Sequence, residues 1–198
     1  MRQVLLLGAM LLLAACAPSV PTRATPPDIT ALAQAIAALS PDVDAAEAAR
    51  AARISFAYSR QLAQEYQITD PPLIHNAKVN AGLRPRGLCY HWAEDMERRL
   101  NAEGFTTLEL TRAIANSESR FLIEHSTAVI KAKGTLMQDG VVLDPWRHGG
   151  RLFWAPVYGD ARYAWKPRTD VLRAKGQIRY AQRPDTSVVP LPADLFQE

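Results

Sequence analysis

Three residues of the sequence have the side chains that a thiol nucleophile and its proton relay require: Cys89, His125 and Asp144. A thiolate needs a base that takes and returns its proton. The base in turn needs a carboxylate that fixes its tautomer and stabilises the imidazolium. Taken together, the three residue types predict a nucleophile (Cys89), a base (His125) and an orienting carboxylate (Asp144).

The surroundings of Cys89 favour a thiolate. Cys89 directly follows Arg84-Pro85-Arg86-Gly87 and stands at the start of a predicted helix over 88–103. Helix N-terminal amides and nearby arginines stabilise negative charge on sulfur. His91 lies about 200° round the helix from Cys89, so it does not face the thiol and is not the expected base. The residues that share the Cys89 face, and that we expect to be buried, are Trp92, Ala93, Met96 and Leu100.

The elements that must position these residues are helices first and strands afterwards. Apolar residues at helical spacing predict helices over 28–39 and from Pro41 to about Tyr66. A loop-like region over 69–87 follows, in which 74–81 is a candidate short helix. The period then changes to two. Expected strands are 106–114, 122–132 and 140–143, with two further short candidates at 151–154 and 163–165. This order predicts an α+β fold with an antiparallel sheet.

The predicted strands bring the base and the carboxylate together. His125 lies within one strand, and Asp144 ends the next strand in VVLDPW. A turn at Asp139-Gly140 separates the two strands, with arms of similar length. We therefore expect Asp144 to lie close to His125. Considered singly, His125 also fits a satisfied core histidine and Asp144 a turn-forming cap.

The sequence around these residues resembles the transglutaminase-like branch of the papain-like thiol enzymes. The matching segments are Gly87-Leu88-Cys89-Tyr90, Glu124-His125-Ser126 with Val129, and Val142-Leu143-Asp144-Pro145, within residues 70–165. The resemblance implies a Cys-His-Asp triad whose nucleophile stands at a helix N-terminus packed against an antiparallel sheet. It also implies acyl transfer or hydrolysis at amide bonds, in a family that includes members without activity.

An oxyanion site and a substrate groove have further candidates. The backbone N–H of Cys89 can supply one oxyanion donor. A second donor can come from Asn76, Asn80 or Tyr90, although both asparagines also fit loop-capping roles. Trp146 and Arg147, with Trp154, can line a groove or shield the core.

The N-terminus predicts export and lipid attachment. Arg2 precedes the apolar run Val4–Leu13, which is too short to span a bilayer and fits a signal peptide over 1–15. Leu13-Ala14-Ala15-Cys16 resembles the lipobox of bacterial lipoproteins. That resemblance implies cleavage before Cys16, its acylation, and, with Ala17 next, an outer-membrane location facing the periplasm. The alternative is an ordinary secretory signal with a chance cysteine.

The sequence after the signal peptide is predicted to contain three segments. We expect a proline-rich tether over 16–27, one domain over 28–182 and a peripheral tail over 183–198. If Cys16 is lipidated, Cys89 is the single free thiol of the mature chain.

Composition limits the possible functions. The chain has 198 residues, is 48% hydrophobic and 22% charged, and has a net charge of +3. This composition excludes a disordered chain and a polytopic membrane protein. No dense Lys/Arg run accompanies the charge, so we expect no nucleic-acid partner. We also expect no cofactor, since no glycine-rich phosphate loop is present.

The sequence thus predicts a membrane-anchored envelope cysteine hydrolase or acyltransferase acting on amide bonds, with an envelope peptide or protein as substrate. Two alternatives stay open. One is a catalytically silent envelope lipoprotein that uses the same fold for binding. The other is a zinc site built from Cys89, His91, His125 and Asp144, although the C-x-H pair points in different directions on a helix.

Overall fold

The computed structural model describes residues 25–177. Its α-helices are α2 (Pro26–Ala37), α3 (Ala45–Glu65), α4 (Pro72–Asn80), α5 (Cys89–Asn101) and α6 (Arg168–Ala174). Its strands are β1 (Leu108–Ala115), β2 (His125–Ala132), β3 (Val141–Asp144), β4 (Phe153–Pro156) and β5 (Lys166–Pro167). Three short 3-10 helices complete it: η2 (Met137–Asp139), η3 (Trp146–His148) and η4 (Val157–Gly159). The predicted signal peptide, Cys16 and the tail over 183–198 lie outside the described residues.

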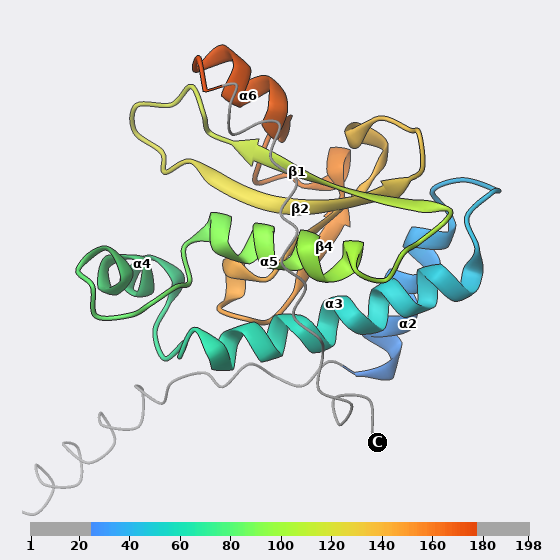
Figure 1. Ribbon diagram of the computed structural model, residues 1–198, viewed down its shortest axis with the longest axis horizontal. Coiled ribbons are helices and arrows are strands. Elements are labelled where there is room, and N and C mark those ends of the chain that lie inside the picture. The colour runs from blue at the N-terminus through green and yellow to red at the C-terminus, as the bar shows by residue number, and fades with distance from the viewer. Residues whose placement is uncertain (1–24, 178–198) are drawn as a thin grey trace, which may run out of the picture.

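The five strands form one antiparallel sheet in the order β4-β3-β2-β1-β5. Helices α2, α3 and α5 cover one face of this sheet, with α5 lying between the sheet and α3 (Figure 1). Helix α6 lies at the other side of the sheet, beyond β1. The predicted α+β class with an antiparallel sheet is therefore confirmed.

The first two helices begin at different residues from those predicted. Helix α2 begins at Pro26, so the last two residues assigned to the tether belong to the helix instead. The Asp28 side chain accepts a hydrogen bond from the Thr25 backbone N–H, which fixes this helix start. Helix α3 begins at Ala45 rather than Pro41, because Asp44 is its N-cap and accepts from the Glu47 N–H at 2.8 Å.

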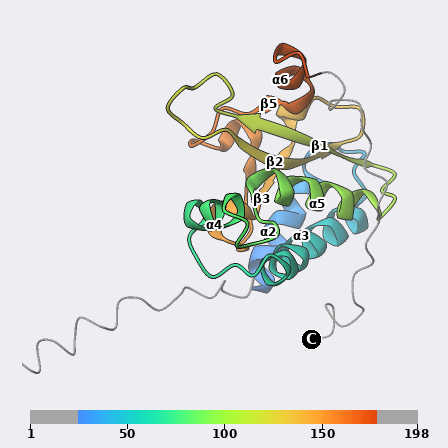
Figure 2. The same cartoon turned by 60° about the vertical axis from the view of Figure 1, so that its left-hand side comes forward.

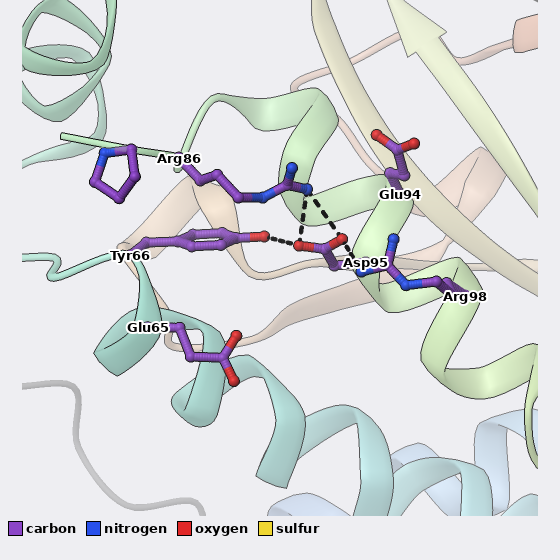
Figure 3. A pocket seen from close by; sticks show the side chains of 7 residues that line it. Glu65, Tyr66, Arg86, Glu94, Asp95 and Arg98 are labelled. Atoms are coloured by element: carbon purple, nitrogen blue, oxygen red, sulfur yellow. Dashed lines mark hydrogen bonds and ion pairs between the residues drawn. The ribbon is translucent and has the colours of Figure 1, made fainter. Parts of the chain in front are cut away.

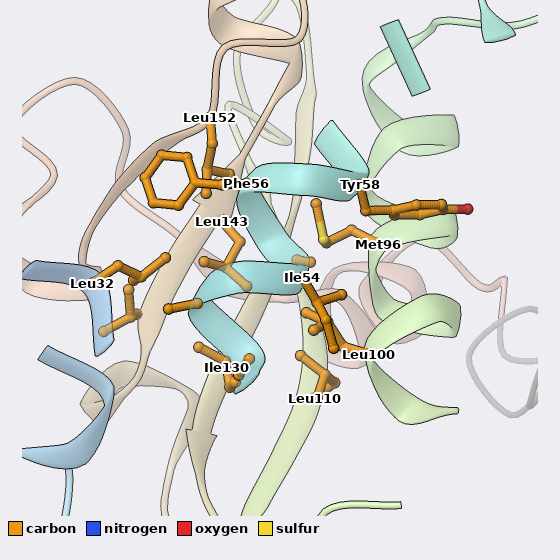
Figure 4. Packing of buried hydrophobic residues seen from close by; sticks show 14 of the residues in the cluster. Leu32, Ile54, Phe56, Tyr58, Met96, Leu100, Leu110, Ile130, Leu143 and Leu152 are labelled. Atoms are coloured by element: carbon orange, nitrogen blue, oxygen red, sulfur yellow. The ribbon is translucent and has the colours of Figure 1, made fainter. Parts of the chain in front are cut away.

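The main core lies between α2, α3, α5 and the sheet (Figure 4). Helical spacing correctly predicted its α3 contribution, since Ile54, Tyr58, Leu62 and Tyr66 are all buried. The predicted buried face of α5 is also confirmed: Trp92, Ala93, Met96 and Leu100 are each at most 1% exposed. These contacts hold α5 flat against β1 and β2, which fixes the position of its first residue, Cys89.

All five predicted strands differ from the observed strands at their ends, and the two largest differences are at β2 and β5. Strand β2 begins at His125 rather than at Leu122, because the residues before it form a hydrogen-bonded loop over 116–124. The last strand is Lys166–Pro167, not 163–165. Trp165 instead packs in a second hydrophobic cluster, with Val129, Val142 and Val157, that is separate from the main core.

Candidate active site

Cys89 is the first residue of α5, and its side chain is 9% exposed. The Sγ atom lies 3.7 Å from the carbonyl oxygen of Glu124, to which the thiol donates. Glu124 immediately precedes β2, so the nucleophile helix begins beside the start of the strand that contains His125. The structure thus brings Cys89 and His125 together although 35 residues separate them in the chain.

Sheet register explains why His125 and Asp144 meet. Ala128 pairs with Leu143 across β2 and β3, and continuing this register places Asp144 opposite Thr127. His125 is two residues before Thr127 on the same strand face, which makes it the diagonal neighbour of Asp144. The His125 Nε2 and Asp144 Oδ2 atoms are 2.7 Å apart, and both side chains are almost fully buried.

This pair fixes the protonation of the imidazole. Burial opposes the charged ring, but the Asp144 carboxylate and the neighbouring Cys89 side chain favour it and raise the pKa of His125 to about 9. Burial also disfavours ionised Asp144, yet His125 and Arg147 lower the pKa of this carboxyl below its usual range. His125 Nδ1 is buried and has no hydrogen-bond partner among residues 25–177. That nitrogen is the one available to exchange a proton with the thiol.

Arg147 binds the Asp144 carboxylate, a contact that was not among its predicted roles. Instead of lining a groove, its side chain is 5% exposed and donates from Nε to Asp144 Oδ2 at 3.0 Å. The other end of the guanidinium donates to both oxygens of Asp160, at 3.1 and 2.5 Å. Asp144 therefore has two buried partners, the His125 imidazole and the Arg147 guanidinium. The i, i+3 spacing of Asp144 and Arg147 was the one sequence signal for this contact.

Aromatic rings enclose the His125 side chain. The centroids of Trp146, Tyr163 and Trp165 lie 4.6, 4.8 and 5.3 Å from that of the imidazole. Trp165 also donates from Nε1 to Asp160 at 3.0 Å, which joins the enclosure to the Arg147 network. The rings keep water from the buried ion pair and strengthen it.

His91 is oriented away from proton transfer with Cys89. Its Nδ1 accepts hydrogen bonds from the backbone N–H groups of Gly87 and Leu88, at 3.1 and 3.2 Å. Burial and the positive charge of Arg86 lower the pKa of His91 to about 4, so the ring is a neutral acceptor. These contacts agree with the expectation that His91 is not the base.

The first-turn amides of α5 are the oxyanion donors nearest to the thiol along the chain. Helix geometry leaves the N–H groups of Cys89 and Tyr90 without an intrahelical acceptor. The Tyr90 phenol is a poorer candidate donor, because the Tyr90 ring is 47% exposed and packs against His91. Among the Tyr90 groups, the backbone N–H is thus better placed than the predicted side chain.

The remaining predicted residues divide into two groups. Trp146 donates from Nε1 to Asn76 Oδ1 at 3.1 Å, so these two candidates are joined to each other and, through the Trp146 ring, to His125. Trp146 is only 8% exposed, which fits the shielding role better than the groove. Asn80 is exposed at the C-terminal end of α4, and no contact ties it to the triad.

Gly87 and His75 pack closely against each other immediately before Cys89. Gly87 has φ of +124°, and a Cβ there would lie 2.3 Å from His75 Nε2. That nitrogen is 2.9 Å from the Arg86 carbonyl oxygen. The buried His75 ring thus packs α4 against the backbone immediately before Cys89, an arrangement that only glycine permits.

A polar pocket of about 450 Å³ lies beside α5, away from the triad (Figure 3). It surrounds Asp95, which accepts hydrogen bonds from Tyr66, Arg86 and Arg98. Because every one of these contacts is internal, we assign this cluster to holding α5 on α3.

No group of three or more His, Cys, Asp or Glu side chains is arranged to hold a metal ion within residues 25–177. No helix in the same range is long and apolar enough to cross a membrane.

Comparison of the chain with protein-family models, with curated proteins and with solved structures gave no match.

Proposed function

We propose that the protein is a cysteine-nucleophile enzyme that cleaves or transfers acyl groups at amide bonds, with a fold of the transglutaminase-like type. The observation that carries this proposal is the position of His125. One ring nitrogen is held by Asp144 at 2.7 Å, while the other is buried, unpaired among the described residues, and beside the Cys89 thiol at a helix N-terminus.

The chemistry follows from these positions. Cys89 Sγ gives its proton to His125 Nδ1 and attacks the amide carbonyl carbon, forming a C–S bond. The N–H groups of Cys89 and Tyr90 then stabilise the oxyanion. The C–N bond breaks as the amine leaves with the proton from His125, and a thioester remains on Cys89. Water, or a second amine, attacks the thioester and returns the thiol. Asp144 holds the imidazolium throughout.

The sequence around Cys16 supports a cellular setting for this activity. A lipobox-like segment and the proline-rich residues after it favour a lipid-anchored protein of the bacterial envelope, on the periplasmic side of the outer membrane. An envelope peptide or protein is then the substrate class that such an enzyme meets.

One observation favours the second candidate function, a silent binding protein. The thiol is only 9% exposed and donates to the Glu124 carbonyl. A site closed in this way fits a protein that retains the fold for binding. Only the reactivity of Cys89 separates the two candidates.

The test uses the chain from Ala17 onward, which retains every described residue and contains a single cysteine. Its alkylation is followed at about pH 6, where an ordinary thiol with a pKa of about 8.5 is almost entirely protonated. We expect Cys89 to react roughly tenfold or more faster than in His125→Ala, because the imidazolium stabilises the thiolate. Asp95→Asn is the matched control, since it alters a buried carboxylate outside the triad.

Thioester formation is the second part of the test. After exposure to an activated acyl donor, intact-mass measurement should show one acyl group on the wild-type chain and none on Cys89→Ser. Slow alkylation that is equal in the wild type and in His125→Ala, without an acyl adduct, would reject the enzyme in favour of the binding protein.

A further inference from the structure

The exposed apolar side chains of the protein are concentrated around the nucleophile. Of the nine large hydrophobic residues that are exposed within residues 25–177, seven lie on α4, on the segment from α4 to the start of α5, or on the loop before β2. We call these seven the apolar rim: Leu73, Ile74, Leu83, Tyr90, Phe121, Leu122 and Ile123. The other two, Leu136 and Tyr158, lie elsewhere in the chain.

Both parts of the rim adjoin Cys89. The loop of Phe121, Leu122 and Ile123 ends at Glu124, whose carbonyl accepts from the thiol. Helix α4 reaches the same place through His75, which packs against Gly87. Figures 1 and 2 show α4 and the loop between β1 and β2 projecting on the same side of the molecule. The two segments that contain the rim residues therefore both adjoin the start of α5, where Cys89 lies.

The loop presents its apolar side chains from a fixed backbone. Ser119 Oγ accepts from the N–H groups of Phe121 and Leu122, at 3.2 and 2.9 Å. Asn116 Nδ2 donates to the Ile123 carbonyl at 3.1 Å. Phe121 is nevertheless 97% exposed. These three backbone groups are already paired, which lowers the cost of bringing the loop into an apolar phase.

Charge and chain length favour a lipid surface as the partner. Lys78 and Arg86 are paired with Asp70 and Asp95, but Arg84 and Arg120, which adjoin Leu83 and Phe121 in the chain, form no salt bridge within residues 25–177. Basic residues beside an apolar surface are attracted to anionic headgroups. If Cys16 is acylated, the nine residues from there to Thr25 span at most about 32 Å, so the domain stays next to the bilayer.

We propose that the apolar rim docks on the surface of a bilayer that contains anionic lipid, with Phe121, Leu122 and Ile123 entering the headgroup boundary. The docked domain then holds Cys89 against the membrane. This proposal goes beyond the proposed function and does not depend on it, because docking needs no reaction at Cys89.

Vesicle binding by the chain from Ala17 onward, which carries no lipid, tests the proposal. The vesicles are phosphatidylethanolamine with phosphatidylglycerol, and the bound fraction is measured by flotation. We expect the wild type and Cys89→Ala to float equally. Phe121→Ser and Leu122→Ser should each weaken binding by roughly tenfold, because each removes one buried apolar side chain from the interface. Uncharged phosphatidylcholine vesicles should bind less protein.

The matched controls are Leu136→Ser and Tyr158→Ser, which remove exposed apolar side chains outside the rim and should bind as the wild type does. All four serine variants alter exposed positions, so their thermal unfolding should match that of the wild type. Absence of wild-type flotation would overturn the proposal, and a protein partner would then be the alternative ligand of the apolar rim. Equal losses in rim and control variants would overturn it as well.

Discussion

Two buried carboxylates, Asp144 and Asp95, occupy similar environments on opposite sides of the nucleophile helix. Asp144 is 1% exposed and Asp95 is 3% exposed. Asp144 is bound by Arg147, and Asp95 by Arg86 and Arg98. The partners beyond the arginines differ. Asp144 holds a histidine whose second nitrogen is unpaired among the described residues, whereas Asp95 holds the Tyr66 hydroxyl.

This difference shows that burial and ion pairing alone do not identify a catalytic carboxylate. Asp95 lines a polar pocket, yet burial and the Asp95 charge raise the pKa of Tyr66, which keeps its proton in place. His125, whose pKa is raised to about 9, is a titratable ring next to a thiol. The Asp144 cluster thus contains a titratable imidazole beside a thiol, and the Asp95 cluster contains no such pair among the described residues.

The largest expected effect comes from removing the thiol or the base. Cys89→Ser and His125→Ala should each reduce acyl transfer by at least roughly a thousandfold, because the members of a triad act as a unit. Steady-state turnover of an amide substrate checks this, with circular dichroism to show that the fold is intact. Full turnover by His125→Ala would remove the triad from the mechanism.

Asp144→Asn should impair turnover less completely than His125→Ala, by roughly a hundredfold or more. The amide can still contact the ring, but it no longer stabilises the imidazolium. The comparison with Asp95→Asn is direct, since that variant should turn over substrate at the wild-type rate. Equal losses in the two variants would mean that the clusters do not differ in function.

Stability should depend on pH through His125. Its pKa is raised from about 6.5 to about 9 in the folded state, so the stabilisation is complete below about pH 6.5 and is lost as pH rises through about 9. The shift corresponds to roughly 3 kcal/mol. Urea unfolding across this range measures it. Asp95→Asn should retain the dependence and Asp144→Asn should lose most of it; the reverse pattern would contradict the assignment.

The smallest of these effects concerns the Asp95 cluster alone. Asp95→Asn should lower the free energy of unfolding by about 2 kcal/mol, because charged hydrogen bonds from Arg86 and Arg98 weaken. Urea midpoints at neutral pH measure this loss. A large loss of Cys89 reactivity in this stable variant would indicate that the cluster also positions the nucleophile.

Much of the fold could be predicted from local patterns. The helical spacing of Ile54, Tyr58, Leu62 and Tyr66 predicted a buried face of α3, and all four are buried. The residues at which helices and strands begin and end were harder to predict. The apolar residues Leu122 and Ile123 match a strand pattern, but Ser119 and Asn116 hold them in a loop, which alternation of residue types does not reveal.

The sequence by itself determined the residue types of the triad, the helix start at Cys89 and the strand end at Asp144, because these depend on local pattern and chain spacing. Only the tertiary structure decided which partners the side chains have. Arg147 binds Asp160, Trp146 binds Asn76, and the end of the loop before β2 lies beside the Cys89 thiol. Such contacts join segments far apart in the chain, so they depend on how the sheet and helices pack rather than on any local preference.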